Sequence, residues 1–292
     1  MRVIQTAREG TGMASKDFMA RVQRWQRRAR IGLRLLGRKA LAGDWRNRAG
    51  TARRRLWEFL LPVGLALAST TAIAQPFYVP SGSMEPTIAI GDEIVVSKYS
   101  YGYGKYAFPY LDMNFVQGRL FAATPQRGDI AVFRPPSEPH INLVKRVIGL
   151  PGDHIQMRNG RLSINGHELV LSRAGTGMVE GPDGVYTEVP RYIETMPDGR
   201  KHPIFKWQWD GPLDNTVAFV VPAGHLFMMG DDRDNSFDSR VPSERGGIGF
   251  IPLDALIGRA RFVLGSIDYL NASSILGWPA EMRAARFFKP LM

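Results

Sequence analysis

The segment NLVKRVIGL, Asn142–Leu150, is an apolar run of strand length that Pro151-Gly152-Asp153 closes. Apolar and β-branched residues in such a run predict a buried strand. A lysine in its middle is unusual, since an unpaired buried ammonium costs several kcal/mol. Lys145 and Arg146 are adjacent and therefore face opposite sides of the strand, so one of them should point inward. The alternative is a lysine on the exposed face of an edge strand.

Similar runs lie on both sides of this segment. The hairpin that follows it is the clearest, because Ile155 and Met157 alternate, Asn159-Gly160 supplies a turn, and Leu162 and Ile164 return. Asn165-Gly166 gives a further turn directly afterwards. The other apolar runs are Asp92–Tyr99, Asp129–Arg134, Thr216–Val221, Leu226–Met229 and Leu256–Leu264.

This pattern predicts a mainly β protein built on an antiparallel β-sheet, with an inserted β lobe over about residues 154–222. Within that lobe, residues 171–215 are more polar and rich in turns, and we expect them to interrupt the run of strands. The chain of 292 residues has no cysteine, which excludes disulfides, thiolate metal sites and cysteine nucleophiles.

The net charge of +11 is concentrated at the N-terminus. Residues 1–55 hold 16 Lys or Arg and 3 Asp or Glu, a net charge of +13, which leaves −2 for the rest. The basic segment directly precedes the most apolar stretch, so it indicates contact with anionic lipid rather than with nucleic acid. Ile31–Leu41 within it is typical of a helix lying on a membrane surface.

The apolar stretch Leu56–Ala74 is long enough to cross a bilayer, at about 1.5 Å per residue, and Glu58 is its only charge. The positive charges before it predict a cytoplasmic N-terminus and an extracytoplasmic body. We therefore expect a basic cytoplasmic tail at 1–55 and one transmembrane helix at 56–75. Two alternatives stay open: a cleavable signal peptide ending at Ala72-Ile73-Ala74, and a buried core helix.

Two further motifs carry polar side chains. In PSGSMEPT, Pro80–Thr87, prolines and a glycine around two serines favour a tight bend with an accessible hydroxyl, as a nucleophile requires. In GDDRDNSFDSR, Gly230–Arg240, four acids, two arginines and two serines follow an apolar run. A calcium loop is the rival interpretation, but the EF-hand glycine and glutamate are missing and arginines would compete with a cation. A network of Asp–Arg pairs that supports a site fits better.

The chain also contains GDEIVVSKYSYG (Gly91–Gly102) and RGDIAVFRPP (Arg127–Pro136). In its motifs and their order, the chain resembles the bacterial type I signal peptidases, the leader peptidases of exported proteins. The resemblance covers about residues 56–265. It implies a Ser/Lys peptidase without cofactor or metal, acting on the signal peptides of preproteins at the bacterial inner membrane, with the export machinery as a possible partner. The catalytic region would span 76–270 and a C-terminal extension 271–292.

The resemblance also implies roles for individual residues. Ser83 matches the nucleophile and Lys145 its general base, while Ser81 would join the Ser83 N–H in an oxyanion hole and Ser236 would orient the lysine. The residues with supporting ionic roles would be Arg146, Asp238 and Arg240. The pockets for small side chains at substrate positions −1 and −3 would have an apolar lining of Phe77, Val79, Met84, Ile88 and Val144.

Some features depart from the family pattern or admit other interpretations. Asp232 stands where the family often has asparagine and adds a negative charge near the site, and only one membrane span is defensible. A self-cleaving repressor with the same chemistry would need an N-terminal DNA-binding domain, and an inactive membrane-anchored β adaptor would have lost its dyad. Penicillin-binding enzymes would need S-x-x-K on one helical turn, which does not accompany Ser83. The tyrosines between Tyr99 and Tyr110 could form an interfacial belt or pack in the core.

Overall fold

The computed structural model describes residues 53–66, 73–107, 118–180, 185–267 and 282–291. The chain divides into two compact units, Met1–Ala66 and Leu67–Met292. The expected surface helix at Ile31–Leu41 and most of the basic tail lie outside the described residues, as do Phe108, Tyr110 and Trp278.

In the first unit the described residues form a helix over 53–66. Among the residues that the structure describes, no helix reaches the length and hydropathy that crossing a membrane requires. Residues 67–72 of the expected span are not among the residues that the structure describes. The expected end of the span was wrong, because Ala74 and Gln75 begin strand β1 (Ala74–Tyr78). Pro76 disfavours helix at the residue before it, and Gln75 pairs instead with Val96.

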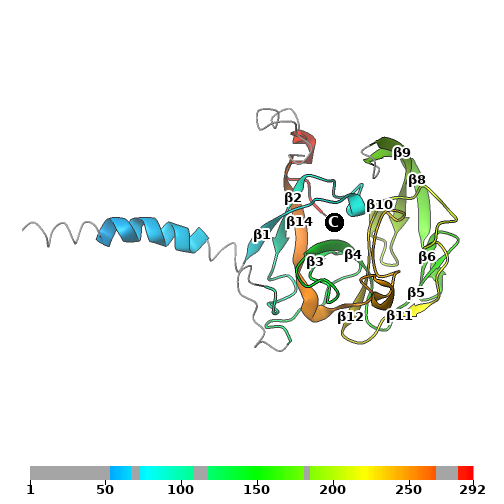
Figure 1. The fold of residues 1–292 in the computed structure, drawn as a ribbon, viewed down its shortest axis with the longest axis horizontal. Helices are drawn as coiled ribbons and strands as arrows, with labels where there is room; N and C mark the ends of the chain where they lie inside the picture. The colour runs from blue at the N-terminus through cyan, green and yellow to red at the C-terminus, as the bar shows by residue number, and fades with distance from the viewer. Residues whose placement is uncertain (1–52, 67–72, 108–117, 181–184, 268–281, 292) are drawn as a thin grey trace, which may run out of the picture. The chain divides into compact units, whose positions relative to one another are not determined.

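The second unit is built on a seven-stranded sheet in the order β1-β2-β14-β3-β4-β12-β13, and all its strand pairs are antiparallel (Figure 1). The expectation of a mainly β, antiparallel fold is therefore confirmed. Besides β1, the strands are β2 (Asp92–Ser97), β3 (Ile130–Phe133), β4 (Leu143–Gly149), β12 (His225–Met229), β13 (Ile251–Pro252) and β14 (Leu256–Ser266).

Two smaller antiparallel sheets arise from the segment between β4 and β12, and Figure 1 draws them beside those strands. One has the order β11-β5-β6-β7, and its Asn159 and Asn165 turns take positive φ angles of 46° and 52°, as tight hairpin turns require. The other has the order β10-β9-β8. The strands are β5 (His154–Arg158), β6 (Arg161–Ile164), β7 (His167–Glu168), β11 (Phe219–Val220), β8 (Val170–Glu180), β9 (Tyr186–Thr195) and β10 (Lys201–Phe205).

The expectation that residues 171–215 interrupt the strands was wrong, because β8 and β9 are 11 and 10 residues long. Most side chains of β9 are exposed or half-buried, so the segment lacks the apolar content by which a buried strand is recognised. The exact limits expected for the tail, the lobe and the C-terminal extension stay predictions.

Strand β4 runs through the middle of the hydrophobic core. Val144 packs against a cluster that contains Val79 and Ile94, whereas Val147 and Ile148 belong to two other clusters. Both faces of β4 are covered, and Lys145 and Arg146 are therefore both buried, with exposed fractions of 3% and 1%. Tyr101 is also buried, which places it in the core rather than in an interfacial belt.

Candidate active site

A single turn of 3₁₀ helix, η1 (Gly82–Met84), carries Ser83. Ser81 precedes it in extended conformation and does not cap it. Met84 in this turn and Ile88 shortly after it are fully buried in a core cluster, and this packing holds the turn in place. Ser83 remains half-buried. The Ser83 carbonyl accepts a hydrogen bond of 3.2 Å from the Asp232 N–H. The serine is thus held on a short turn tied to the segment Gly230–Arg240.

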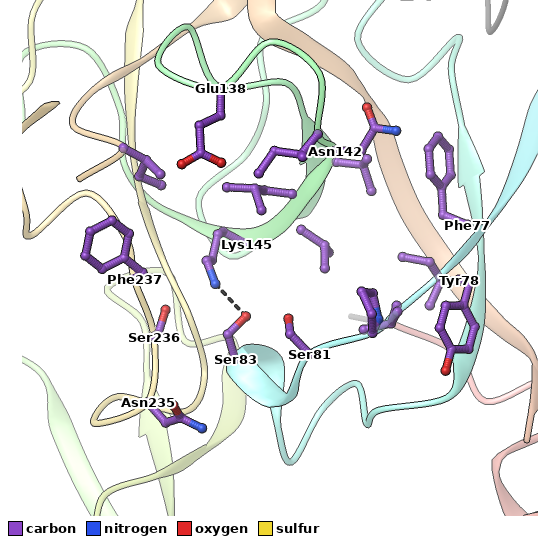
Figure 2. Close-up of a pocket in the computed structure, with 18 of the residues that line it drawn as sticks. Phe77, Tyr78, Ser81, Ser83, Glu138, Asn142, Lys145, Asn235, Ser236 and Phe237 are labelled. Carbon is purple, nitrogen blue, oxygen red and sulfur yellow. Dashed lines mark hydrogen bonds between the residues drawn. The ribbon is translucent and has the colours of Figure 1, made fainter. Parts of the chain in front are cut away.

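Lys145 reaches Ser83 from β4. Its Nζ donates a hydrogen bond to Ser83 Oγ at 2.5 Å, across 62 residues of sequence (Figure 2). Its neighbour on β3 is Ala131, whose small side chain is directly opposite in the register. The two residues that the sequence singled out are therefore in direct contact.

The pKa of Lys145 is lowered from its ordinary value to about 8. Burial is the largest cause, since it penalises the charged ammonium, and Arg240 acts in the same direction. Asp238, Asp231 and Asp232 oppose this shift. With such a pKa, about a tenth of the lysine is neutral at pH 7 and about half at pH 8. A neutral amine bonded to a serine hydroxyl can accept its proton.

The Ser83–Lys145 pair faces a cavity of about 770 Å³. Figure 2 shows Ser81, Ser83 and Ser236 around the amine, with Phe77 and Tyr78 at one end and Glu138 and Phe237 at the other. Ser81 is exposed to this cavity and Ser236 is buried. No histidine is among the described residues that line it.

The apolar wall of the cavity differs in part from the expected one. Phe77, Val79 and Val144 line it, and their role in binding substrate side chains stays a prediction. Met84 and Ile88 do not, because both point to the core side of the η1 segment and are fully buried there. The described lining includes apolar residues that the sequence analysis did not single out, namely Ile94, Val132, Leu143 and Phe237.

Ser236 lies beside the lysine, but its hydroxyl oxygen makes no hydrogen bond to the described residues. Gly230 explains how closely this segment approaches Ser83. A Cβ atom at Gly230 would lie 2.2 Å from Ser236 Oγ and 2.4 Å from the Ser83 carbonyl oxygen. Only glycine therefore fits between the two serines at this position.

The expected network of Asp–Arg pairs is present beneath the site. Arg240 Nε donates to Asp238 Oδ1 at 2.8 Å, and the Gly230 N–H donates to Asp238 Oδ2 at 3.1 Å. Although burial alone would raise the pKa of Asp238, the Arg240 guanidinium holds it below its ordinary value. Arg146 pairs with Asp231 rather than with Asp238. Because these carboxylates already bind cations of the chain, the calcium-loop interpretation is not favoured.

Asp232 and Glu85 differ from the other acids around the turn. Burial raises the pKa of each to about 7, and each has an oxygen without a hydrogen bond to the described residues. Glu85 also raises the pKa of Asp232. The negative charge that we expected Asp232 to add is consequently reduced at neutral pH.

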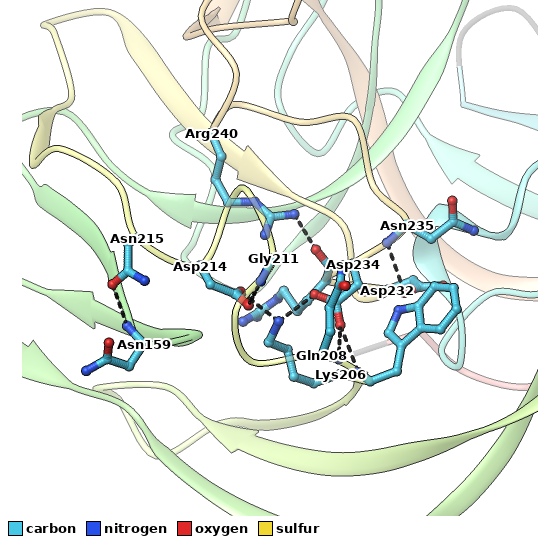
Figure 3. Close-up of polar contacts among 12 residues, drawn as sticks. Asn159, Lys206, Gln208, Gly211, Asp214, Asn215, Asp232, Asp234, Asn235 and Arg240 are labelled. Carbon is cyan, nitrogen blue, oxygen red and sulfur yellow. Dashed lines mark hydrogen bonds and ion pairs between the residues drawn. The ribbon is translucent and has the colours of Figure 1, made fainter.

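Several supporting residues were not predicted from the sequence. Glu194 on β9 accepts two hydrogen bonds from Arg233, at 2.7 and 2.5 Å, and links the smaller sheet to the Gly230–Arg240 segment. Lys206 binds Asp214 and Asp234, at 2.6 and 2.5 Å, in the same region (Figure 3). Arg286 in the C-terminal segment pairs with Asp92 and donates to the Thr87 carbonyl. Apart from Lys206 and Asp214, these partners lie far apart in the sequence, so no local pattern could have revealed them.

A serine hydroxyl bonded to a buried amine, beside an apolar cavity, supplies the parts that a serine hydrolase needs. The model of a family described as signal peptidase, peptidase S26, matches residues 52–265. The signal peptidase I of Rickettsia typhi is 36% identical over 82% of this chain and 94% of its own length. That of Rickettsia akari is 39% identical over 74% of this chain and 81% of its own length.

The chain therefore belongs to the signal peptidase family, peptidase S26, and it is a serine peptidase. A crystal structure of a signal peptidase I from Enterococcus faecalis V583 covers 47% of this chain and 97% of its own, with 24% identity and a TM-score of 0.27.

Proposed function

We propose that this chain is a membrane-anchored endopeptidase that removes N-terminal signal peptides from exported preproteins, with Ser83 as the nucleophile and Lys145 as the general base. The observation that carries the proposal is the 2.5 Å hydrogen bond from Lys145 Nζ to Ser83 Oγ, made by a lysine that is 3% exposed. Membership of the signal peptidase family supports the choice of substrate.

In the first half of the reaction, neutral Lys145 takes the hydroxyl proton while Ser83 Oγ attacks the scissile carbonyl carbon. The lysine then protonates the leaving amine, and the substrate's acyl group stays on Ser83 as an ester. In the second half, a water molecule gives a proton to Lys145 and attacks the ester. The carboxylic acid product leaves and Ser83 recovers its proton.

The oxyanion formed in both halves would be held by the Ser83 N–H and the Ser81 hydroxyl. Ser83 lies in the first turn of η1, where backbone N–H groups have no acceptor within the helix. Ser81 is exposed to the same cavity. Removal of one such donor typically costs about 2.7–4 kcal/mol of transition-state stabilisation. Ser236 would orient the lysine once substrate excludes water, since its hydroxyl oxygen is buried and available.

The preference for small side chains at positions −1 and −3 follows from the resemblance, and the cavity is compatible with it. Phe77, Val79 and Val144 give an apolar wall next to Ser81, where a short apolar side chain can bind without burying an unpaired polar group. The other end of the cavity, with Glu138 and Phe237, would take the leaving chain (Figure 2).

Anchoring by the N-terminal segment is supported by its side chains. On the helix at 53–66, Leu56, Phe59 and Leu65 are exposed by 55%, 68% and 62% within the structure. Exposed apolar side chains in such a run favour burial in lipid. We therefore place residues 1–55 in the cytoplasm of a bacterium and the peptidase domain outside its inner membrane, where it can meet preproteins that leave the export machinery.

The proposal is tested with the full chain in detergent and a preprotein that carries Ala-x-Ala before its mature sequence. N-terminal sequencing of the product should show cleavage directly after that motif. Replacement of the −1 alanine by leucine should prevent cleavage, whereas replacement at −2 should not. Cleavage at other sites, or indifference to the −1 residue, would contradict the proposed specificity. Extraction with alkaline carbonate tests the anchor, because an integral protein stays with the membrane.

A further inference from the structure

A second cavity of about 500 Å³ lies in the same unit as the active-site cavity and shares none of its described lining residues. The side chain of Arg146 reaches it, and this side chain leaves β4 on the face opposite that of Lys145. The described lining contains no acidic residue. Its polar members are Gln126, Arg146, Arg200, Lys201, His202 and Arg259.

Two cations of this cavity, Arg200 and Arg259, share one carboxylate group. Arg259 and Arg200 share one oxygen of the buried Asp129 carboxylate, at 3.2 and 3.8 Å, and that oxygen makes no hydrogen bond to the described residues. The other oxygen of Asp129 is taken by the Tyr101 hydroxyl and the Gln126 N–H. Each guanidinium has five N–H donors. Arg200 directs Nε and Nη2 at Asp198 and Nη1 at the shared oxygen, so the printed contacts with described residues leave donors of both guanidinium groups available to a ligand.

The deeper part of the cavity is lined by buried side chains. Arg146 is held by Asp231 and by the Gly128 carbonyl. His202 is 3% exposed, and its Nε2 lies 3.3 Å from Glu194 without a hydrogen bond to the described residues. Lys201 stands at the exposed edge. Buried, preorganised donors with exposed cations at the entrance are what binding of an oxyanion requires.

We propose that this cavity binds a small oxyanion of the phosphate class, held between the Arg200 and Arg259 guanidinium groups with Lys201 at the entrance and Arg146 behind it. Two guanidinium forks match the paired oxygens of such a group better than a single ammonium would. The proposal does not depend on the peptidase chemistry, because the cavity is separate from the one that faces Ser83.

The test is calorimetric titration of inorganic phosphate into the full chain in a non-ionic detergent at low salt. We expect saturable binding of one phosphate per chain. Arg200→Gln and Lys201→Gln should each weaken binding about tenfold or more, since each removes one charge-assisted contact. Both side chains reach solvent, so neither substitution should prevent folding. Arg259→Gln should weaken binding as strongly.

Arg161→Gln is the matched control, because Arg161 forms an exposed pair with Glu168 at 3.3 Å in a different sheet. Phosphate should bind this variant as it binds the wild type. Equal weakening in the control and in Arg200→Gln would mean non-specific attraction to a basic chain and would overturn the proposal. Absence of saturable binding to the wild type would overturn it as well.

The same contacts could serve a free phosphate or the headgroup of an anionic lipid, and nanodiscs distinguish the two. The phosphate titration is repeated in phosphatidylcholine nanodiscs with and without phosphatidylglycerol. If phosphatidylglycerol weakens phosphate binding to the wild type, and this effect of the lipid is lost in Arg200→Gln, the ligand is a lipid headgroup. Unchanged binding identifies a soluble phosphate. Both results keep the oxyanion site, whereas binding that is insensitive to Arg200→Gln contradicts it.

Discussion

Arg146 holds Asp231 through two hydrogen bonds, from Nε to Oδ1 at 2.8 Å and from Nη2 to Oδ2 at 2.7 Å, and both side chains are 1% exposed. Burial alone would raise the pKa of Asp231, but the Arg146 guanidinium holds it below its ordinary value. The Thr87 hydroxyl donates to the same carboxylate. The pair therefore joins β4, which carries Lys145, to the segments that carry Ser83 and Ser236.

Removal of one partner from this pair should strongly destabilise the protein. Asp231→Ala leaves the Arg146 guanidinium buried without a carboxylate, which typically costs about 3–5 kcal/mol in the free energy of unfolding. Glu168→Ala removes the carboxylate of the exposed pair with Arg161 and should cost less than about 1 kcal/mol. Urea denaturation of both variants checks the difference, and equal losses would show that the buried pair is not a main support of the fold.

Gly230→Ala should abolish most activity through a steric effect. The added methyl group would collide with Ser236 Oγ and with the Ser83 carbonyl, so the turn that carries Ser83 and the segment that carries Ser236 must move apart. We expect kcat/KM to fall by about a hundredfold or more, since small displacements at a reacting centre have such effects. Gly265→Ala is the control, because a Cβ there meets only the Phe287 ring at an ordinary 3.5 Å. Similar activity in the two variants would contradict the packing described.

Ser236→Ala separates an orienting role from a structural one. The hydroxyl makes no hydrogen bond to the described residues, so its removal should leave the thermal midpoint of unfolding almost unchanged. If the hydroxyl orients the lysine during the reaction, kcat should fall by about 10- to 1000-fold while KM changes little. Wild-type kcat in a folded Ser236→Ala variant would remove Ser236 from the mechanism.

The rate should depend on pH through Lys145. Because burial lowers the pKa of this lysine to about 8, the fraction of neutral amine, and with it kcat/KM, should rise nearly tenfold per pH unit below that value and level off above it. Asp238 raises this pKa, so Asp238→Asn should move the rising limb to lower pH whatever its effect on the maximal rate. A rate that is flat between pH 5 and 9 would argue against lysine as the base.

Ser83 and Lys145 could be singled out from the sequence because each lies in a recognisable motif and the order of these motifs resembles that of a known family. Asn142–Leu150 carries its strand signal in its own apolar residues, and the structure places β4 there. The Asn159 and Asn165 turns were predictable for the same reason, since positive φ angles favour asparagine and glycine.

The remaining features depend on contacts that no local pattern contains. β8 and β9 form an antiparallel pair, and most side chains of β9 are exposed or half-buried, so its hydrophobic signal is weak. Met84 and Ile88 are apolar residues close to Ser83 in the sequence, and only the three-dimensional path of this segment shows that they point into the core. The Arg233–Glu194 pair joins residues 39 positions apart.

The most direct test of the account is the kcat/KM of purified Ser83→Ala and Lys145→Ala variants on an Ala-x-Ala preprotein, with folding checked by near-ultraviolet circular dichroism. Lys145→Met is added as a variant that fills the same buried space without an amine. The account predicts that all three fold and that each loses activity by about a thousandfold or more, since nucleophile and base act as a unit. Substantial cleavage by a folded Lys145→Met variant, or by Ser83→Ala, would contradict the proposed Ser83–Lys145 mechanism.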